Sequence, residues 1–116
     1  MPLLGVCRGM QIINYFFNGN IVRINNHVAI NHKIFLELNG KYLNKIVNSF
    51  HNWGLFSQDL SGNLKVFAKG EDESVEGLYH PKFKIKGIMW HPERITNTFR
   101  KFDINLLQNF FLTQSI

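Results

Sequence analysis

The feature that most constrains the fold is a lone cysteine between two glycines, in the run GVCRG at residues 5–9. The apolar residues at 2–6 predict a short buried strand that leads into this run. Residues 9–17 carry apolar side chains at three- and four-residue spacings, which predict a helix. A strand that turns sharply into a helix strains the residue at the turn and requires small neighbours. The side chain of Cys7 is therefore expected to project from the sheet.

A thiol at this position is suited to nucleophilic catalysis. Unpaired N–H groups and the positive end of the helix dipole favour the thiolate of Cys7. The N–H of Arg8 would also point toward an acyl oxygen and supply one donor of an oxyanion hole. The alternative is a buried structural cysteine, because free cysteines are common in protein cores. The short motif alone leaves both interpretations open, and a nucleophile needs a base.

The segment GIMWHPE at 87–93 offers such a base. An apolar strand is expected to end at Trp90, so the imidazole of His91 emerges at the end of the strand. In an extended segment residues two apart point to the same side, so Glu93 can hold one ring nitrogen. The other nitrogen is then left to take a proton from Cys7. Taken alone, the segment is better explained by a turn that ends a strand.

The rest of the chain predicts paired strands and a closing helix. Strands are expected at 21–24, 32–38, 46–50, 64–70, 73–79 and 83–90, and a helical turn at 41–46. Asp103 is a good N-cap for the closing helix, whose apolar face consists of Ile104, Leu107, Phe110 and Phe111. A chain of 116 residues with this order of elements indicates one α/β domain.

Composition excludes several classes of function. The net charge is +5, but the basic residues are scattered, and the nearest approach to a cluster is Arg94, Arg100 and Lys101. Nucleic-acid binding is therefore not expected. No apolar run reaches the length of a membrane span, and no membrane association is expected. A single cysteine fits a reducing compartment, so we expect a cytoplasmic protein.

Three segments together resemble the class I glutamine amidotransferase family, and within it the γ-glutamyl hydrolase branch. They are PLLGVCRGMQ (2–11), VNSFHN (47–52) and GIMWHPER (87–94). The resemblance implies the C-terminal portion of a flavodoxin-like, three-layer α/β sandwich with a nucleophile elbow. Residues 1–116 would form a partial domain, because the family places several strands and a glycine-rich loop before the elbow. One edge of the sheet and an apolar face are then expected to be open, which would favour self-association.

The resemblance implies a triad of Cys7 as nucleophile, His91 as general base and then acid, and Glu93 as the group that orients His91. Cys7 would attack a γ-glutamyl carbonyl, form a thioester and release ammonia or an amine, and water would then release glutamate. Residues implied to bind the substrate are Arg8, Gln11, Asn48, Ser49, Phe50 and His51. The alternatives are a solvent-facing helix residue for Gln11 and polar side chains satisfied at a strand end for Ser49 and His51.

No cofactor or metal is expected, because His27, His32 and His80 make no convincing metal site with nearby carboxylates. Met89, the NSFHN segment and the elbow are similar to relatives found with surface-polysaccharide biosynthesis. That similarity implies a γ-glutamyl phosphoramidate of a nucleotide as the substrate. A second hypothesis is a glutaminase component that feeds ammonia to a synthetase partner. A third, of a different class, is a truncated, catalytically inactive remnant that acts as an interaction module.

Overall fold

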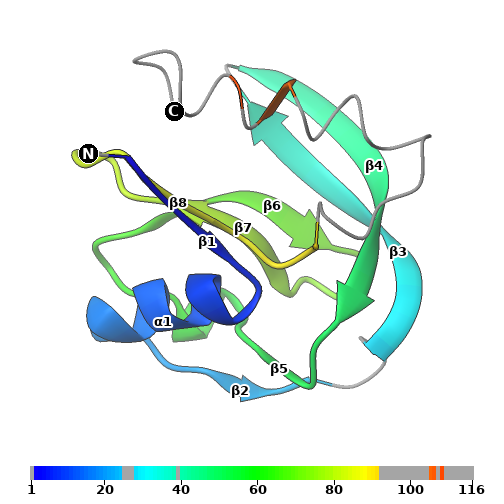
Figure 1. Ribbon diagram of the computed structural model, residues 1–116, viewed down its shortest axis with the longest axis horizontal. Helices are drawn as coiled ribbons and strands as arrows, with labels where there is room; N and C mark the ends of the chain where they lie inside the picture. Colours follow the sequence, from blue (N-terminus) through cyan, green and yellow to red (C-terminus); the bar gives the residue numbers. More distant parts are fainter. Residues whose placement is uncertain (1, 25–27, 39, 92–104, 107, 109–116) are drawn as a thin grey trace.

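A computed structural model describes residues 2–24, 28–38, 40–91, 105, 106 and 108 (Figure 1). Six of the described strands form one mixed sheet in the order β1-β8-β7-β6-β3-β4, and two form a small separate sheet. The elements in chain order are β1 (Leu3–Val6), α1 (Arg8–Phe16), β2 (Val22–Arg23), β3 (Val28–Leu38), β4 (Lys41–Phe50), β5 (Trp53–Gly54), the 3-10 helix η1 (Ser57–Asp59), β6 (Lys65–Gly70), β7 (Val75–Tyr79) and β8 (Ile85–Ile88).

The pairing of β1 with β8 positions the site. It is parallel, with Leu3 opposite Ile85 and Val6 opposite Ile88, whereas the other pairs of the main sheet are antiparallel. Among the described strands β1 stands at the end of the order, and Leu3 is exposed. The long β3–β4 hairpin bends away from the rest of the sheet, as Figure 1 shows.

The main sheet carries two apolar clusters. Helix α1 lies along one face and buries Met10 and Ile13 in a cluster with Leu55, Leu64, Val75, Leu78 and Met89. The second cluster comprises Ile34, Leu36, Val47, Phe67, Ala68, Ile88, Trp90 and Leu106. The alternation at the end of β8 explains the division, because successive side chains of an extended chain point to opposite faces. Ile88 and Trp90 enter one cluster and Met89 enters the other.

The two glycines that flank Cys7 have different surroundings. A Cβ atom on Gly5 would lie 2.6 Å from the backbone carbon and oxygen of Gly9, so any larger residue would force β1 and α1 apart. At Gly9 no described atom lies within 4 Å of such a Cβ. The expected requirement for a small residue is confirmed at Gly5. At Gly9 the expectation is wrong, because among the described residues nothing would crowd a larger side chain there.

All of the expected strands are present, with shifted ends, but the helical turn expected at 41–46 is wrong. These residues belong to β4, which pairs with β3 in unbroken register from Ile30 opposite Ser49 to Leu38 opposite Lys41. Gly40, at φ 78°, forms the turn between the two strands, a conformation that glycine adopts without strain. Of the expected closing helix only 105, 106 and 108 are described; Asp103, Ile104, Leu107, Phe110 and Phe111 lie outside the described residues. The cluster of Arg94, Arg100 and Lys101 and the side chain of His27 also lie outside them.

None of the helices described is long and apolar enough to cross a membrane.

Candidate active site

The sharp turn predicted at the GVCRG run is present. Cys7 stands between the last residue of β1 and the first of α1, with φ 55° and ψ −104°. A cysteine with positive φ is strained, at a cost of about 1–3 kcal/mol. Its N–H donates to the carbonyl of Ile88 (2.7 Å), and its carbonyl accepts the N–H of Gln11 (3.2 Å). These bonds attach the turn to β8 on one side and to α1 on the other.

His91 lies at the same edge of the sheet as Cys7. Cys7 directly follows β1, and His91 comes three residues after the end of β8, the parallel neighbour of β1. The carboxyl ends of adjacent parallel strands meet at one edge, which is where open α/β sheets place their ligands. Both residues are half-buried. Glu93, the third member of the expected triad, lies outside the described residues.

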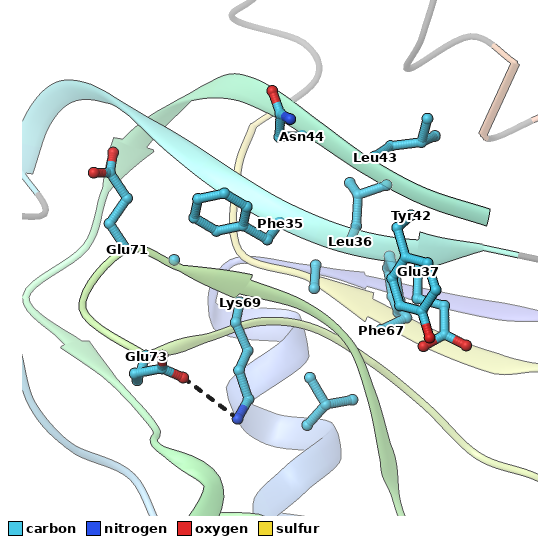
Figure 2. Close-up of a pocket in the computed structure, with 13 residues that line it drawn as sticks. Phe35, Leu36, Glu37, Tyr42, Leu43, Asn44, Phe67, Lys69, Glu71 and Glu73 are labelled. Carbon is cyan, nitrogen blue, oxygen red and sulfur yellow. Dashed lines mark ion pairs between the residues drawn. The ribbon is translucent and has the colours of Figure 1, made fainter. Parts of the chain in front are cut away.

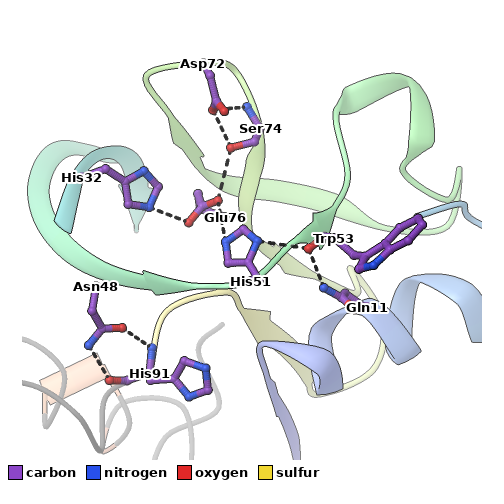
Figure 3. A network of polar contacts seen from close by, with 9 residues as sticks. All are labelled: Gln11, His32, Asn48, His51, Trp53, Asp72, Ser74, Glu76 and His91. Carbon is purple, nitrogen blue, oxygen red and sulfur yellow. Dashed lines mark hydrogen bonds and ion pairs between the residues drawn. The ribbon is translucent and has the colours of Figure 1, made fainter. Parts of the chain in front are cut away.

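The backbone of His91 is held by a side chain from the other end of the sheet order. The Oδ1 atom of Asn48 accepts the N–H of His91 (2.7 Å), and Nδ2 of Asn48 donates to the carbonyl of His91 (2.9 Å), as Figure 3 shows. Asn48 is only 8 % exposed. In the structure, therefore, Asn48 has contacts with the expected base, whereas the sequence suggested contacts with the substrate.

Gln11 and His51 meet at one backbone carbonyl. The oxygen of Trp53 lies 2.7 Å from Nε2 of Gln11 and 3.0 Å from Nδ1 of His51 (Figure 3). A carbonyl oxygen only accepts hydrogen bonds, so Nδ1 of His51 carries a hydrogen. Both side chains are buried or nearly so. The structure thus brings two of the expected substrate-binding residues together from α1 and from the end of β4.

Behind His51 lies a carboxylate that the sequence did not identify. Glu76, on β7, is fully buried, and its Oε2 atom lies 3.9 Å from Nε2 of His51 and 3.2 Å from Oγ of Ser74. Its Oε1 atom lies 3.2 Å from Nε2 of His32 (Figure 3). A buried carboxylate needs a cationic or hydrogen-bonding partner, and two imidazoles serve here. We call Glu76, His32, His51 and Ser74 the Glu76 network.

The electrostatics of His32 reflect this neighbour. Burial lowers the pKa of His32, but the Glu76 carboxylate, with smaller contributions from Asp72 and Glu71, raises it by more. The net effect is a pKa above the ordinary value of 6.5. The protonated imidazole is therefore favoured beside Glu76. The only sequence signal for Glu76 was an acidic residue within an otherwise apolar strand, which is also typical of a solvent-facing position.

The other expected binding residues are distributed around the same region. Ser49 is fully buried in β4, and Phe50 is its last residue, with a side chain outside the described set. The exposed side chain of Arg8 and that of Gln11 line a hollow of about 450 Å³ with Ile12, Tyr15, Ile21 and Trp53. This hollow adjoins the start of α1 and contains two of the residues implied to bind the substrate.

A second hollow, of about 480 Å³, lies between β3, β4 and β6 (Figure 2). It contains none of the expected site residues, and its one drawn ion pair joins Lys69 to the exposed Glu73. His80 is also engaged elsewhere, since its Nδ1 atom accepts the N–H groups of Lys82 and Phe83. Across the described residues, no three His, Cys, Asp or Glu side chains are grouped so as to hold a metal ion.

Comparison with known proteins identifies the family and the fold of this chain. The model of the class-I glutamine amidotransferase family matches residues 1–114. The chain belongs to this family. Its α/β fold is that of the glutamine amidotransferases, as the solved structures also indicate. Over 94 % of its length the chain superimposes, with a TM-score of 0.77 and 24 % identity, on 55 % of a GMP synthase subunit from Thermoplasma acidophilum.

Two curated relatives of this amidotransferase domain carry different activities in their names. A γ-glutamyl-CDP-amidate hydrolase from Campylobacter jejuni is 37 % identical over 94 residues, which is 81 % of this chain and 44 % of the relative. A glutamine-hydrolysing GMP synthase subunit from Methanococcus aeolicus is 28 % identical over 96 residues, which is 80 % of this chain and 51 % of the relative. The chain thus spans about half the length of these relatives.

Proposed function

We propose that this domain cleaves γ-glutamyl amide bonds through a thioester on Cys7. The observation that carries the proposal is the parallel pairing of β1 with β8. It places the strained Cys7 turn and His91 at the same edge of the sheet. A strained turn at a helix N-terminus exposes a thiol to unpaired N–H groups, and a histidine at the neighbouring strand end is suited to accept its proton.

In this mechanism His91 takes the proton from Sγ of Cys7, and the sulfur attacks the γ-carbonyl carbon of the substrate. The carbon–nitrogen bond breaks, and the leaving nitrogen takes the proton back from His91. Water then gives a proton to His91 and attacks the thioester, which releases glutamate and returns the proton to Cys7. The N–H of Arg8 would stabilise the oxyanion, and Glu93 would orient the imidazole. Gln11, Ser49 and His51 would bind the glutamyl group.

The leaving group that we favour is a nucleotide phosphoramidate. The supporting observation is the similarity to the γ-glutamyl-CDP-amidate hydrolase of Campylobacter jejuni. The net charge of +5 is compatible with a phosphate-bearing substrate. This activity would take place without a partner and without a cofactor.

The second candidate function is a glutaminase component that supplies ammonia to a synthetase. The similarity to a glutamine-hydrolysing GMP synthase subunit favours it. The two functions differ in their dependence on a partner. A stand-alone hydrolase releases glutamate from its substrate in isolation, whereas a glutaminase component releases ammonia from glutamine only when a synthetase is added.

The test of both is covalent trapping of Cys7 with a glutamine-analogue diazo ketone, followed by peptide mass spectrometry. We expect labelling of Cys7 in the folded chain, protection by a γ-glutamyl amide, and loss of turnover in Cys7→Ala with little change in the unfolding midpoint. Absence of labelling in the folded chain would exclude both enzymatic functions and would support the interaction module. Turnover retained in Cys7→Ala would refute the nucleophile.

A further inference from the structure

The two hydrogen bonds between Asn48 and His91 resemble those of a strand partner. One side-chain amide satisfies both the N–H and the carbonyl of a single residue, at 2.7 Å and 2.9 Å. Within a sheet, a neighbouring strand would supply this donor and this acceptor from its own backbone. Here a single buried side chain supplies both. Both bonds fall in the range of good geometry, so together they restrain the backbone of His91.

The position of these bonds in the fold makes them informative. β8 ends at Ile88, after which the N–H of Met89 donates to the carbonyl of Glu76 and Trp90 is fully buried. His91 is the next residue, and Asn48 holds it from β4, at the opposite end of the sheet order. The next residue in the sequence, Pro92, has no N–H to donate to a strand ladder.

The chemistry of the side chain also matters. An amide offers both a donor and an acceptor, and it stays neutral throughout the pH range in which thiols and imidazoles titrate. A carboxylate in its place would accept the N–H but repel the carbonyl, and a hydroxyl is too short to reach both groups in this way. Asparagine is thus well suited to fix a backbone beside a titrating histidine without altering its charge.

We propose that Asn48 is a positioning residue for the general base, one that fixes the backbone of His91 so that its imidazole stays beside Cys7. This inference rests on the proposed function, in which His91 exchanges a proton with Cys7. It reassigns Asn48, which the sequence suggested as a substrate contact. A base displaced by about 1 Å typically costs on the order of 100-fold in rate, so the effect of losing the restraint should be large.

The experiment measures the rate at which iodoacetamide alkylates Cys7 as a function of pH. This small reagent needs no glutamyl-binding pocket, so the profile reports the thiolate and its imidazole partner. The proteins compared are the unmodified chain, His91→Asn, Asn48→Ala and the matched control Asn44→Ala. Asn44 lies on the same strand four residues earlier, is exposed and lines the hollow of Figure 2, away from the site.

We expect His91→Asn to raise the apparent pKa of Cys7 and Asn48→Ala to shift it in the same direction, while Asn44→Ala leaves the profile unchanged. On a γ-glutamyl substrate, kcat of Asn48→Ala should fall on the order of 100-fold with KM changed less than about threefold. A residue that only supports the fold would move the unfolding midpoint but not the thiol profile. Should Asn48→Ala not fold, Asn48→Leu, which keeps the bulk of the side chain and adds no charge beside His91, takes its place.

The outcomes separate the two claims. If His91→Asn leaves the pH profile of Cys7 alkylation unchanged, His91 is not the base for Cys7 and the proposed function is refuted. If His91→Asn shifts the profile but the folded Asn48 variant does not, the proposed function stands and the positioning role is overturned. A raised KM with unchanged kcat in the Asn48 variant would also overturn it, because that result marks a substrate contact.

Discussion

The carboxyl end of β4 makes two polar connections to the rest of the molecule, and they differ in kind. Asn48 holds the backbone of His91 through two short hydrogen bonds between neutral groups. Three residues later, His51 reaches the Trp53 carbonyl on one side and the buried carboxylate of Glu76, at 3.9 Å, on the other. One connection cannot titrate, whereas the other is built from titratable groups. The hydrogen bonds that hold the backbone of the expected base are thus independent of pH, whereas the connection through His51 and Glu76 is not.

The largest expected difference is in the cost of losing each connection. Glu76→Gln removes a buried charge from between two histidines, which typically costs about 3–5 kcal/mol of unfolding free energy. Asn48→Ala removes the side-chain donor and acceptor that two backbone groups of His91 use, which should cost about 1–3 kcal/mol. Urea unfolding at pH 7 measures both, with the exposed Glu73→Gln as a control that should stay within about 0.5 kcal/mol. If Glu76→Gln lowers the unfolding free energy by less than Asn48→Ala does, the predicted order of the two connections is wrong.

The neutral connection can be converted into a titratable one. In Asn48→Asp at pH 7 the carboxylate faces the carbonyl of His91, so we expect a loss of about 2 kcal/mol. Protonation restores a donor, which raises the pKa of the introduced carboxyl above its unfolded value of about 3.9. Its favourable contribution is then present below that value and lost as the pH rises through the folded pKa. Urea denaturation at pH values from 4 to 7 tests this. If the difference in unfolding free energy between Asn48→Asp and the parent chain stays the same over that range, the prediction is wrong.

The Glu76 network should give the parent chain its own pH dependence. The pKa of His32 is raised above 6.5, since the Glu76 carboxylate outweighs the lowering by burial. Its contribution to stability is complete below pH 6.5 and is lost as the pH rises through the folded pKa. The free energy of unfolding should therefore fall over that range in the parent chain and in Asn48→Ala, but less steeply in His32→Gln. Equal slopes in all three proteins would exclude this role for His32.

The smallest expected effect is the coupling between the two connections. They share no hydrogen-bond partner among the contacts described above, so the costs of Asn48→Ala and Glu76→Gln should add. The coupling free energy from a double-mutant cycle should stay below about 0.5 kcal/mol. A larger value would show that the two connections act as one network.

The local elements were predictable where one residue pattern decides them. The strand before Cys7, the turn and α1 followed from an apolar run, two glycines and a helical periodicity, because all three act within a few residues. Residues 41–46 were not predictable in the same way, since KYLNKI has no clean alternation. Their extended conformation is decided by pairing with β3 across the hairpin. Gly9 was expected to be crowded, and only the surroundings in space show that it is not.

The site was predictable to a similar extent. The resemblance to the family implied that the cysteine after one strand and the histidine after another lie close together, whereas their parallel neighbouring strands are seen only in the structure. The contact between Asn48 and His91 could not be predicted, because it depends on how the β3–β4 hairpin bends relative to the rest of the sheet. Glu76 was missed for a related reason. Its burial depends on His32 and His51, which lie 44 and 25 residues earlier in the chain.

The backbone angles of Cys7 set folding stability against the presence of a thiol at one position. Glycine adopts positive φ without strain, so Cys7→Gly would relieve part of the roughly 1–3 kcal/mol stored in the turn. The same substitution would remove the only thiol in the chain. A variant chosen for stability alone would therefore lose the thiol, whereas any variant that keeps the thiol also keeps the strain of the turn.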